Sequence, residues 1–509
     1  MIFALLLVAW SILIIFLVKM KKLGEGLTLF GPALMIKTKR GRRIIERAGS
    51  HRIWRYFGNF SICISVIMIV GVFLLLLWQA ILVMNIPPSS APSPVEAIGI
   101  PGINPVIPIG YGIIGLVVAI VVHELAHGLL IANQKMKILS LGILLFIIPI
   151  GAFVEPDEEE LKKVPRKKRM RVFAAGPTTN LIVALIALLL FVSLISGISP
   201  KYSGMYVAAN YEDGPNAGII PVGAVLLSVN NVNITDYEDF YSINAPLPGD
   251  KVNVTFVMHD KVENAEAWSG VVITYVSEGY PAYESGIKPG WIIYSINGTV
   301  IRNEKEFFDV MNTTRAGETV EIKLFKPTNM WMSVNVTLAD KYEYFEKYAP
   351  QYNKEWYRGK GFLGVNANYL GIALGDAKYL KNILANPLYG ADNPSTAFRR
   401  LLLYIALPFA GLMPLPDNLA ALFNTPFTGF WFVANALYWI FWLNLMLGMT
   451  NLLPAIPLDG GYVLRDFIDG LFEKIKIRES RKAADIIAAL FSFSVLFLIL
   501  WQFIAPRFI

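Results

Sequence analysis

The sequence predicts a polytopic α-helical membrane protein with a re-entrant β-hairpin or loop near a candidate active site and an inserted extracytoplasmic β-rich region. Three observations predict this class. Only 16% of the 509 residues are charged, and long apolar runs recur along the chain, which is not the composition of a soluble domain. A polar block at about 200–345 interrupts these runs. Residues 201–343 hold 10 basic and 18 acidic residues, a net charge of −8, so the rest of the chain carries +15.

This charge asymmetry predicts how the chain crosses the membrane. Short loops rich in Lys and Arg face the cytoplasm. Residues 37–56 carry eight basic residues and one acid, and 155–171 hold a second basic cluster. Both are therefore expected in the cytoplasm and the acidic central block outside it, and the basic residues do not indicate a nucleic-acid partner. The one cysteine, Cys63, excludes an internal disulfide and a cysteine-based zinc site.

The N-terminal part predicts two membrane helices. Residues 2–18 are apolar, end at three lysines and show no small-residue cleavage site, so we expect a retained transmembrane helix. Residues 57–84 form a second span that runs outward, and 85–108, rich in Pro and Gly, form an external loop. The three lysines are Lys19, Lys21 and Lys22.

The span at 109–134 contains the pattern H-E-x-x-H. Its residues are His123, Glu124 and His127, and the chain has only four histidines. Positions i and i+4 of a helix share a face, so both imidazoles can reach one ion while the glutamate reaches a water beside it. The alternative is a set of polar groups satisfied inside a buried helix. Ionisable groups at membrane depth are costly and mark functional sites, which favours the metal site.

Two further segments complete the first part of this membrane core. Residues 138–154 are apolar but contain Gly142, Pro149 and Gly151, so we expect a re-entrant β-hairpin beside the metal helix, with a further transmembrane helix as the alternative. The basic cluster in 155–171 precedes an apolar run that extends to Ile195, and this run contains Asn180. An Asn inside a span needs a partner, either a neighbouring helix or a functional group.

The central block contains an internal repeat with an offset of 67 to 68 residues. Gly218 to Asn231 matches Gly286 to Gly298, and the match extends to Pro248-Gly249-Asp250 against Ala316-Gly317-Glu318. Short β runs, Asn-Gly turns and one helix per copy resemble tandem PDZ domains, which bind extended peptides by strand addition. A purely structural or occluding role is the alternative.

Five glycosylation sequons fall in this block, which mildly supports its external location. An Asn- and Thr-rich surface would give the same sequons by chance and is the alternative. The sequon residues are Asn233, Asn253, Asn297, Asn312 and Asn335.

The C-terminal part predicts two more spans. Residues 401–415 are apolar but too short to cross, so we expect a re-entrant or interfacial helix there. The span at 427–452 ends in two prolines and two glycines around Asp459, and 484–505 form the final span. A carboxylate in apolar surroundings should pair with a cation, here a metal at the two histidines, unless it caps the following helix.

Three motifs together resemble the site-2 protease family of intramembrane zinc metalloproteases. They are His123-Glu124-x-x-His127, Gly176-Pro177-x-x-Asn180 and Asn451-x-x-Pro454-x-x-x-Leu458-Asp459-Gly460. The resemblance implies one Zn²⁺ per chain held by His123, His127 and Asp459, with Glu124 as general base. It implies that Asn180 and Asn451 contact the substrate backbone or the developing oxyanion. It also implies that the segment at 138–154 offers a strand edge to an unwound substrate.

The resemblance implies hydrolysis of peptide bonds within or near membrane-spanning segments, after a prior cleavage, with the PDZ-like modules filtering or binding substrate. The expected partners are single-span proteins in the lipid bilayer, such as membrane-anchored signalling or anti-sigma-type proteins. The expected location is a prokaryotic cell membrane, with the site reached from the cytoplasm. A PDZ scaffold or sensor with a non-catalytic metal site is the alternative, and a metal transporter is a third class without a visible ion pathway.

These inferences divide the chain into six regions. The expected divisions are 1–84 (N-terminal helices and basic loop), 109–197 (first part of the core), 200–269 (first PDZ-like domain), 270–345 (second PDZ-like domain), 346–425 (extracytoplasmic or interfacial region) and 426–509 (second part of the core with the last helix).

Overall fold

The computed structural model describes residues 2–20, 24, 26–85, 91–146, 148–349 and 352–508. It divides into two compact units. The first comprises Met1–Leu194, Ile405–Pro414 and Trp431–Ile509, and the second comprises Ile195–Tyr404 and Leu415–Phe430. Two expectations fall partly outside the described residues, namely the basic end of the first apolar run at Lys21 and Lys22, and 86–90 of the predicted external loop.

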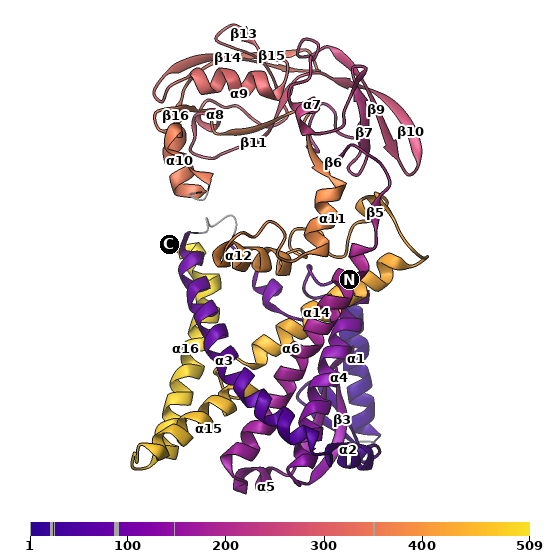
Figure 1. Ribbon diagram of the computed structural model, residues 1–509, viewed down its shortest axis with the longest axis vertical. Helices are drawn as coiled ribbons and strands as arrows, with labels where there is room; N and C mark the ends of the chain where they lie inside the picture. The colour runs from indigo at the N-terminus through magenta and orange to yellow at the C-terminus, as the bar shows by residue number, and fades with distance from the viewer. Residues whose placement is uncertain are drawn as a thin grey trace. The chain divides into compact units, whose positions relative to one another are not determined.

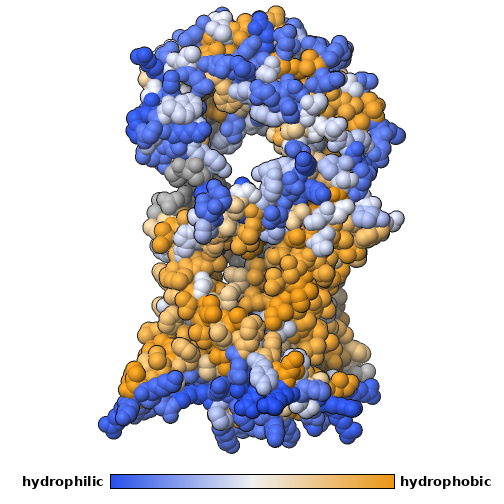
Figure 2. Space-filling view, in the orientation of Figure 1, coloured by the Kyte–Doolittle hydropathy of each residue, from blue (hydrophilic) through white to orange (hydrophobic). Residues whose placement is uncertain are grey.

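The first unit is a helical bundle with an apolar surface. Among the described residues, five helices are long and apolar enough to cross a membrane, and Figure 2 shows a broad hydrophobic belt over this unit. The five are α3 (Ile53–Leu82), α4 (Ile109–Asn133), α6 (Arg166–Ser196), α14 (Phe430–Asn451) and α16 (Ser480–Phe508). An N-terminal helix, α1 (Ile2–Lys19), is also apolar. The prediction of a polytopic membrane protein with a β-rich region is confirmed.

Residues 401–415 do not form one of these long helices. Helix α12 (Pro394–Ile405) has 12 residues and ends within this stretch, and a short α13 (Asp417–Ala420) follows after a series of turns. Twelve residues at 1.5 Å each give a helix of about 18 Å, less than the roughly 30 Å apolar thickness of a bilayer. A membrane-crossing helix over this stretch is therefore absent from the structure.

A four-stranded antiparallel sheet accompanies the helices of the first unit. Its order is β1-β2-β3-β4, so β4 lies at an edge. The strands are β1 (Leu27–Phe30), β2 (Ala33–Thr38), β3 (Ile138–Phe146) and β4 (Ile148–Pro156). The predicted hairpin is present as β3 and β4, whereas the pairing of residues 27–38 with it was not predicted. Gly142 permits this pairing, because a Cβ there would lie 2.4 Å from the Ile36 carbonyl oxygen.

Charged residues gather at one end of this unit, around α2 (Arg42–Gly49), α5 (Glu158–Lys163) and α15 (Asp459–Lys474) (Figures 1 and 2). Asp466 is buried at this end and accepts hydrogen bonds from Arg169 at 2.6 and 2.9 Å and from Arg481 at 2.8 Å. A buried carboxylate needs such partners. The network therefore ties α6, α15 and α16 together at this end of the unit.

The second unit contains two sheets with matching strand order. The first runs β10-β9-β7-β6-β19 with β8 beside β7, and the second runs β15-β14-β12-β11-β18 with β13 beside β12. The first set is β6 (Met205–Asn210), β7 (Val225–Val229), β8 (Val232–Asn233), β9 (Lys251–Met258), β10 (Lys261–Trp268) and β19 (Ile372–Asp376). The second set is β11 (Val271–Val276), β12 (Ile292–Ile296), β13 (Thr299–Val300), β14 (Thr319–Lys326), β15 (Met330–Thr337) and β18 (Val365–Tyr369).

Short helices and strands complete the second unit. The first sheet is accompanied by α7 (Tyr237–Tyr241) and the second by α9 (Glu304–Thr313), which lies beside its sheet in Figure 1. The remaining elements are β5 (Ser199–Pro200), α8 (Pro281–Glu284), β16 (Ala339–Asp340), α10 (Lys341–Tyr348), β17 (Gly361–Phe362), α11 (Ala377–Ala385) and β20 (Phe423–Asn424).

The two modules are nested, which differs from the expected division at 270 and 345. Strand β18 pairs with β11 and completes the second sheet, and β19 then pairs with β6 and completes the first. The second module is therefore inserted into the first. The segments Phe362-Leu363-Gly364-Val365 and Tyr369-Leu370-Gly371-Ile372 repeat one pattern within a few residues. The sequence analysis placed both segments in 346–425, because local patterns do not show which sheet a strand joins.

Candidate metal centre

Two histidines and an aspartate converge in the first unit. His123 and His127 lie one turn apart on α4, and their Nε2 atoms are 3.1 Å apart. Asp459, the first residue of α15, places its Oδ2 atom 3.2 Å from His123 Nε2 and 3.3 Å from His127 Nε2. The structure thus brings together two residues of one helix and a third that lies more than 300 positions along the chain. Among the described residues, these three His and Asp side chains lie close enough together to hold one metal ion.

Hydrogen bonds on the far side of each ring orient the two histidines. His127 Nδ1 lies 2.8 Å from the Val172 carbonyl oxygen, and His123 Nδ1 lies 2.7 Å from Asn180 Oδ1. A carbonyl oxygen only accepts, so Nδ1 of His127 carries a proton, and in the neutral ring Nε2 keeps its lone pair. Partners of this kind fix the tautomer and direction of metal-binding imidazoles.

The spacing of these atoms fits a tetrahedral zinc ion. Zinc bonds to His nitrogen and carboxylate oxygen are about 2.0–2.2 Å, which places neighbouring tetrahedral ligand atoms about 3.3 Å apart. The three ligand-to-ligand distances are 3.1, 3.2 and 3.3 Å. Two His and one carboxylate also match the protein ligands of catalytic zinc sites, which keep a further position for water or substrate.

Gly176 explains why helix α6 approaches the two rings so closely. A Cβ atom at this position would lie 2.4 Å from His127 Nε2 and 2.8 Å from His123 Nε2. Real Cβ atoms do not approach other atoms so closely, so any larger residue would displace the imidazoles. Small residues in membrane helices commonly allow close packing between helices. In the structure this glycine makes room for the candidate ligands themselves.

Glu124 lies beside the three candidate ligands without being one of them. Its Oε2 atom accepts a hydrogen bond of 3.1 Å from the Val154 backbone N–H. Val154 belongs to β4, the edge strand of the four-stranded sheet. The next turn of α4 also meets this strand, because a Cβ at Gly128 would lie 3.2 Å from the Val154 side chain. The sheet edge and the carboxylate of Glu124 are therefore in contact.

The alternative role predicted for Asp459, a helix cap, is not the one that the structure shows. Leu458 occupies the N-cap position of α15, and no side chain caps this helix end. Helix α14 ends at Asn451, and turns at 452–458 lead into α15. Gly460 and Gly461 permit this turn, since a Cβ on either would lie 2.5–2.6 Å from backbone atoms of the preceding segment.

The two asparagines predicted to contact substrate lie in different surroundings. Asn180 is fully buried, and its side chain bonds to His123, to Ala119 and to Asn444. Asn451 donates a 3.0 Å hydrogen bond to the carbonyl oxygen of Leu447 in its own helix. The sequence analysis did not single out Asn444, although an Asn inside an apolar span was a usable signal.

Comparison with known proteins places the chain in a family. A profile of peptidase family M50 matches residues 111–498, more than half of the chain, and this match includes every candidate ligand. The chain belongs to peptidase family M50, the site-2 protease family. The resemblance inferred from the three motifs is thereby confirmed. The family implies zinc, and in this M50 protein His123, His127 and Asp459 form the group that fits it.

Three relatives are similar in sequence to parts of this M50 protein. An uncharacterized protein of Methanocaldococcus jannaschii is 36% identical over 210 residues, covering 40% of this chain and 54% of that protein. A Borreliella burgdorferi protein named as a zinc metalloprotease is 26% identical over 192 residues, covering 35% and 44%. A membrane-bound transcription factor site-2 protease homolog of Arabidopsis thaliana is 23% identical over 187 residues, covering 34% and 35%. The matches thus span about a third to a half of these relatives.

Proposed function

We propose that this chain is an intramembrane zinc metalloprotease that hydrolyses peptide bonds within or near the membrane-spanning segments of single-span proteins. The observation that carries the proposal is the convergence of His123 and His127, on the membrane-length helix α4 beside Glu124, with Asp459 at the start of α15. A structural zinc site is closed and has no use for an adjacent general base. The presence of Glu124 beside this site therefore favours catalysis.

The chemistry assigns distinct tasks to the residues of the site. When bound, zinc acts as a Lewis acid that activates water and polarises a carbonyl. Glu124 accepts the proton of the attacking water and returns it to the leaving amine. The bond from Val154 N–H holds one oxygen of Glu124 in place. This contact also sets the distance between the base and the sheet edge at which we expect the substrate.

Strand β4 is the surface on which we expect the substrate to lie. It is the edge strand of its sheet, so an added strand can pair with its outer backbone groups other than the Val154 N–H, which donates to Glu124. A substrate helix hides its carbonyl groups in its own hydrogen bonds, so it must unwind locally before attack. Pairing with β4 would replace those bonds by ladder bonds, as in other peptide complexes formed by strand addition.

The charge distribution supports access from the cytoplasm. Basic residues of α2 and of the first turns of α6 gather at one end of the helical unit, close to the ends of α3 and α4. By the positive-inside rule this end faces the cytoplasm. On this orientation the β-rich unit, which follows the opposite end of α6, is extracytoplasmic, and we propose a prokaryotic cell membrane as the location.

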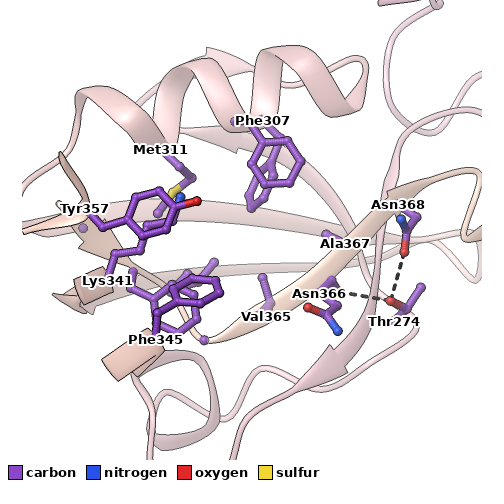
Figure 3. Close-up of a pocket in the computed structure, with 15 residues that line it drawn as sticks. Thr274, Phe307, Met311, Lys341, Phe345, Tyr357, Val365, Asn366, Ala367 and Asn368 are labelled. Atoms are coloured by element: carbon purple, nitrogen blue, oxygen red, sulfur yellow. Dashed lines mark hydrogen bonds between the residues drawn. The ribbon is translucent and has the colours of Figure 1, made fainter. Parts of the chain in front are cut away.

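A groove in the second PDZ-like module supports peptide binding by the β-rich unit. A cavity of about 460 Å³ lies between α9 and β18, where Phe307 and Met311 of the helix face Val365 and Ala367 of the strand (Figure 3). Strand β18 is the edge strand of its sheet. An extended peptide can therefore pair with β18 while alternate side chains enter the apolar groove.

One end of this groove offers a cation to an anionic ligand. Lys341 lines the cavity together with the Gly361–Phe362 strand and the glycine turn after it (Figure 3). Its Nζ atom lies 4.3 Å from the Tyr357 ring centre, and no acid among the described residues forms an ion pair with it. Burial, followed by the nearby charge of Lys354, lowers the pKa of Lys341. We propose that it receives the terminal carboxylate of a substrate left by a prior cleavage.

A peptide with a free carboxyl terminus should bind the full-length protein more tightly than the same peptide amidated. The probe is a peptide of about ten residues ending in valine, titrated calorimetrically against the protein in detergent. Lys341→Gln should weaken binding of the free-acid peptide about tenfold or more, because a hydrogen bond to a charged group contributes about 1.5–3 kcal/mol.

The matched control for this experiment is Lys323→Gln. Lys323 lies on β14 of the same module and is about half exposed beside Glu321, away from the residues that line the groove. It should leave peptide affinity unchanged. Equal binding of the free-acid and amidated peptides would contradict the role of Lys341, and absence of binding by either would contradict peptide recognition in this groove.

Removal of zinc should abolish cleavage reversibly. We expect chelator-treated protein in detergent to lose cleavage of a single-span substrate and to recover it on addition of Zn²⁺. Zinc at 100 times its dissociation constant should also raise the free energy of unfolding by about 2.7 kcal/mol, because it binds only the folded site. Cleavage assays, metal analysis and thermal unfolding measure these effects. Full cleavage by protein shown to be free of metal would refute the proposed function.

A further inference from the structure

We infer that Asn180 and Asn444 form a buried hydrogen-bond relay that holds the His123 ring with its Nε2 lone pair directed at the candidate metal position. Asn180 is then a positioning residue for His123, and Asn444 is a positioning residue for Asn180. The inference rests on the metal site of the proposed function, because it concerns how one ligand is oriented. It differs from the substrate or oxyanion contact expected of Asn180 from the sequence.

The relay links three membrane helices. His123 is on α4, Asn180 on α6 and Asn444 on α14. Asn180 Oδ1 lies 2.7 Å from His123 Nδ1, and Asn180 Nδ2 lies 3.0 Å from Asn444 Oδ1. Both asparagines have no exposed surface, and His123 is 6% exposed. Close packing permits these contacts, since a Cβ at Gly448 would lie 3.3 Å from the Asn180 Cβ.

Two backbone carbonyl groups fix the direction of every bond in the relay. Asn180 Nδ2 donates to the Ala119 oxygen at 2.9 Å, so the oxygen end of this amide must face His123. Asn444 Nδ2 donates to the Ile440 oxygen at 2.8 Å, so its oxygen end must face Asn180. Carbonyl oxygens only accept, and turning either amide over would bring two acceptors together. His123 Nδ1 must therefore be the donor, and in the neutral ring this leaves Nε2 without a proton.

The membrane strengthens the hold of these hydrogen bonds on the two amides. An unpaired polar group at bilayer depth has no water to bond with, so each amide is held strongly to its partners. The two N–H donors of Asn180 are committed to Ala119 and Asn444. A donor committed in this way is not free to bond to a substrate oxyanion. Orientation of His123 is the role that the contacts of Asn180 support.

The test is a double-mutant cycle on zinc affinity. Zinc dissociation constants of the full-length protein in detergent are measured by competition with a chelator, for wild type, Asn180→Leu, Asn444→Leu and the double variant. Asn180→Leu should weaken zinc binding about 10–100-fold, the usual effect of losing a partner of a metal ligand. Asn444→Leu should weaken it less. The double variant should match Asn180→Leu alone, because Asn444 acts through Asn180.

Losses that simply add in the double variant would overturn the relay. The control is Trp442→Phe, because Trp442 lies on α14 like Asn444. Its Nε1 donates a 2.9 Å hydrogen bond to the Ile405 oxygen, and the substitution removes this bond. This variant should bind zinc as wild type does. If Trp442→Phe weakens zinc binding as much as Asn444→Leu, the effect is general disturbance of α14 and the relay is refuted.

A second readout does not depend on metal or activity. In zinc-free protein labelled with ¹⁵N-histidine, the His123 ring should carry its proton on Nδ1, and Asn180→Leu should shift part of the population to the Nε2 tautomer. An unchanged tautomer in that variant would refute the relay. If wild type binds no zinc, the proposed function fails and this spectrum alone decides the relay. If every variant binds zinc as wild type does, the relay fails and the proposed function stands.

Discussion

Glu124→Gln should lower the rate of peptide-bond hydrolysis about 10²–10⁴-fold while zinc remains bound. The loss corresponds to removal of a positioned general acid and base. Glutamine keeps the length of the side chain and an oxygen that can accept the Val154 N–H bond, but it cannot take up a proton from water. Zinc content should not change, because the three converging ligand atoms belong to His123, His127 and Asp459.

The measurement is the cleavage rate of a single-span substrate in detergent, with metal analysis of each preparation. Glu46→Gln is the matched control, because Glu46 on α2 is partly exposed and pairs with Arg42 at 2.9 Å. It should retain full cleavage and zinc. Full activity of Glu124→Gln with zinc bound would contradict its role as base. Loss of zinc in that variant would instead identify Glu124 as a metal ligand.

Asp459→Asn should weaken zinc binding more than 10–100-fold, which is the usual effect of losing a residue that only hydrogen-bonds to a metal ligand. The cleavage rate should fall in proportion to zinc occupancy. The substitution conserves size but replaces an anionic ligand by a neutral amide. In addition, the new N–H group would lie close to two imidazole nitrogens, since Oδ2 is 3.2 and 3.3 Å from them. A hydrogen bond from that amide would occupy a lone pair that the metal needs.

Chelator competition and metal analysis measure this effect in the full-length protein. Asp485→Asn on α16 is the control, because Asp485 is about half exposed and pairs with Arg465 and Arg481 at 3.9 and 3.7 Å. It should leave zinc affinity unchanged. Undiminished zinc binding by Asp459→Asn would remove Asp459 from the ligand set and would require another residue to take its place.

The two variants separate two roles within one site. Glu124→Gln is expected to bind zinc without cleaving, and Asp459→Asn is expected to fail at the earlier step of holding the ion. A non-catalytic metal site would respond to Asp459→Asn alone, because its zinc would not depend on a base. Comparison of zinc content with cleavage in both variants therefore also tests the scaffold or sensor alternative.

Local patterns were sufficient to predict the framework of the site. The spacing of His123 and His127 sets their common helix face, whatever surrounds the helix. The long apolar runs predicted each of the five long helices, because length and hydropathy are local properties. The three motifs were also sufficient to identify the family. Glycines and a proline within 138–154 predicted the hairpin of β3 and β4.

Long-range contacts decided what the sequence analysis did not predict. Nothing near residues 27–38 indicates that β2 pairs with β3, more than 100 residues away. The strand order of the two sheets also could not be predicted from the sequence, because β18 and β19 lie within a few residues of each other but join different modules. Pairing of edge strands depends on which backbone groups meet in space, and sequence periodicity carries no information about that.

The sequence by itself determined which side chains are offered to the site, namely the residues that can hold a metal and the carboxylate of Glu124 next to them. Only the tertiary structure decided how those groups are oriented. It placed Asp459 against the two histidines, Gly176 beneath their rings and Asn180 behind His123. The reason is physical: residue type and helical spacing fix what a side chain can donate or accept, whereas its partner is fixed by the packing of separate helices.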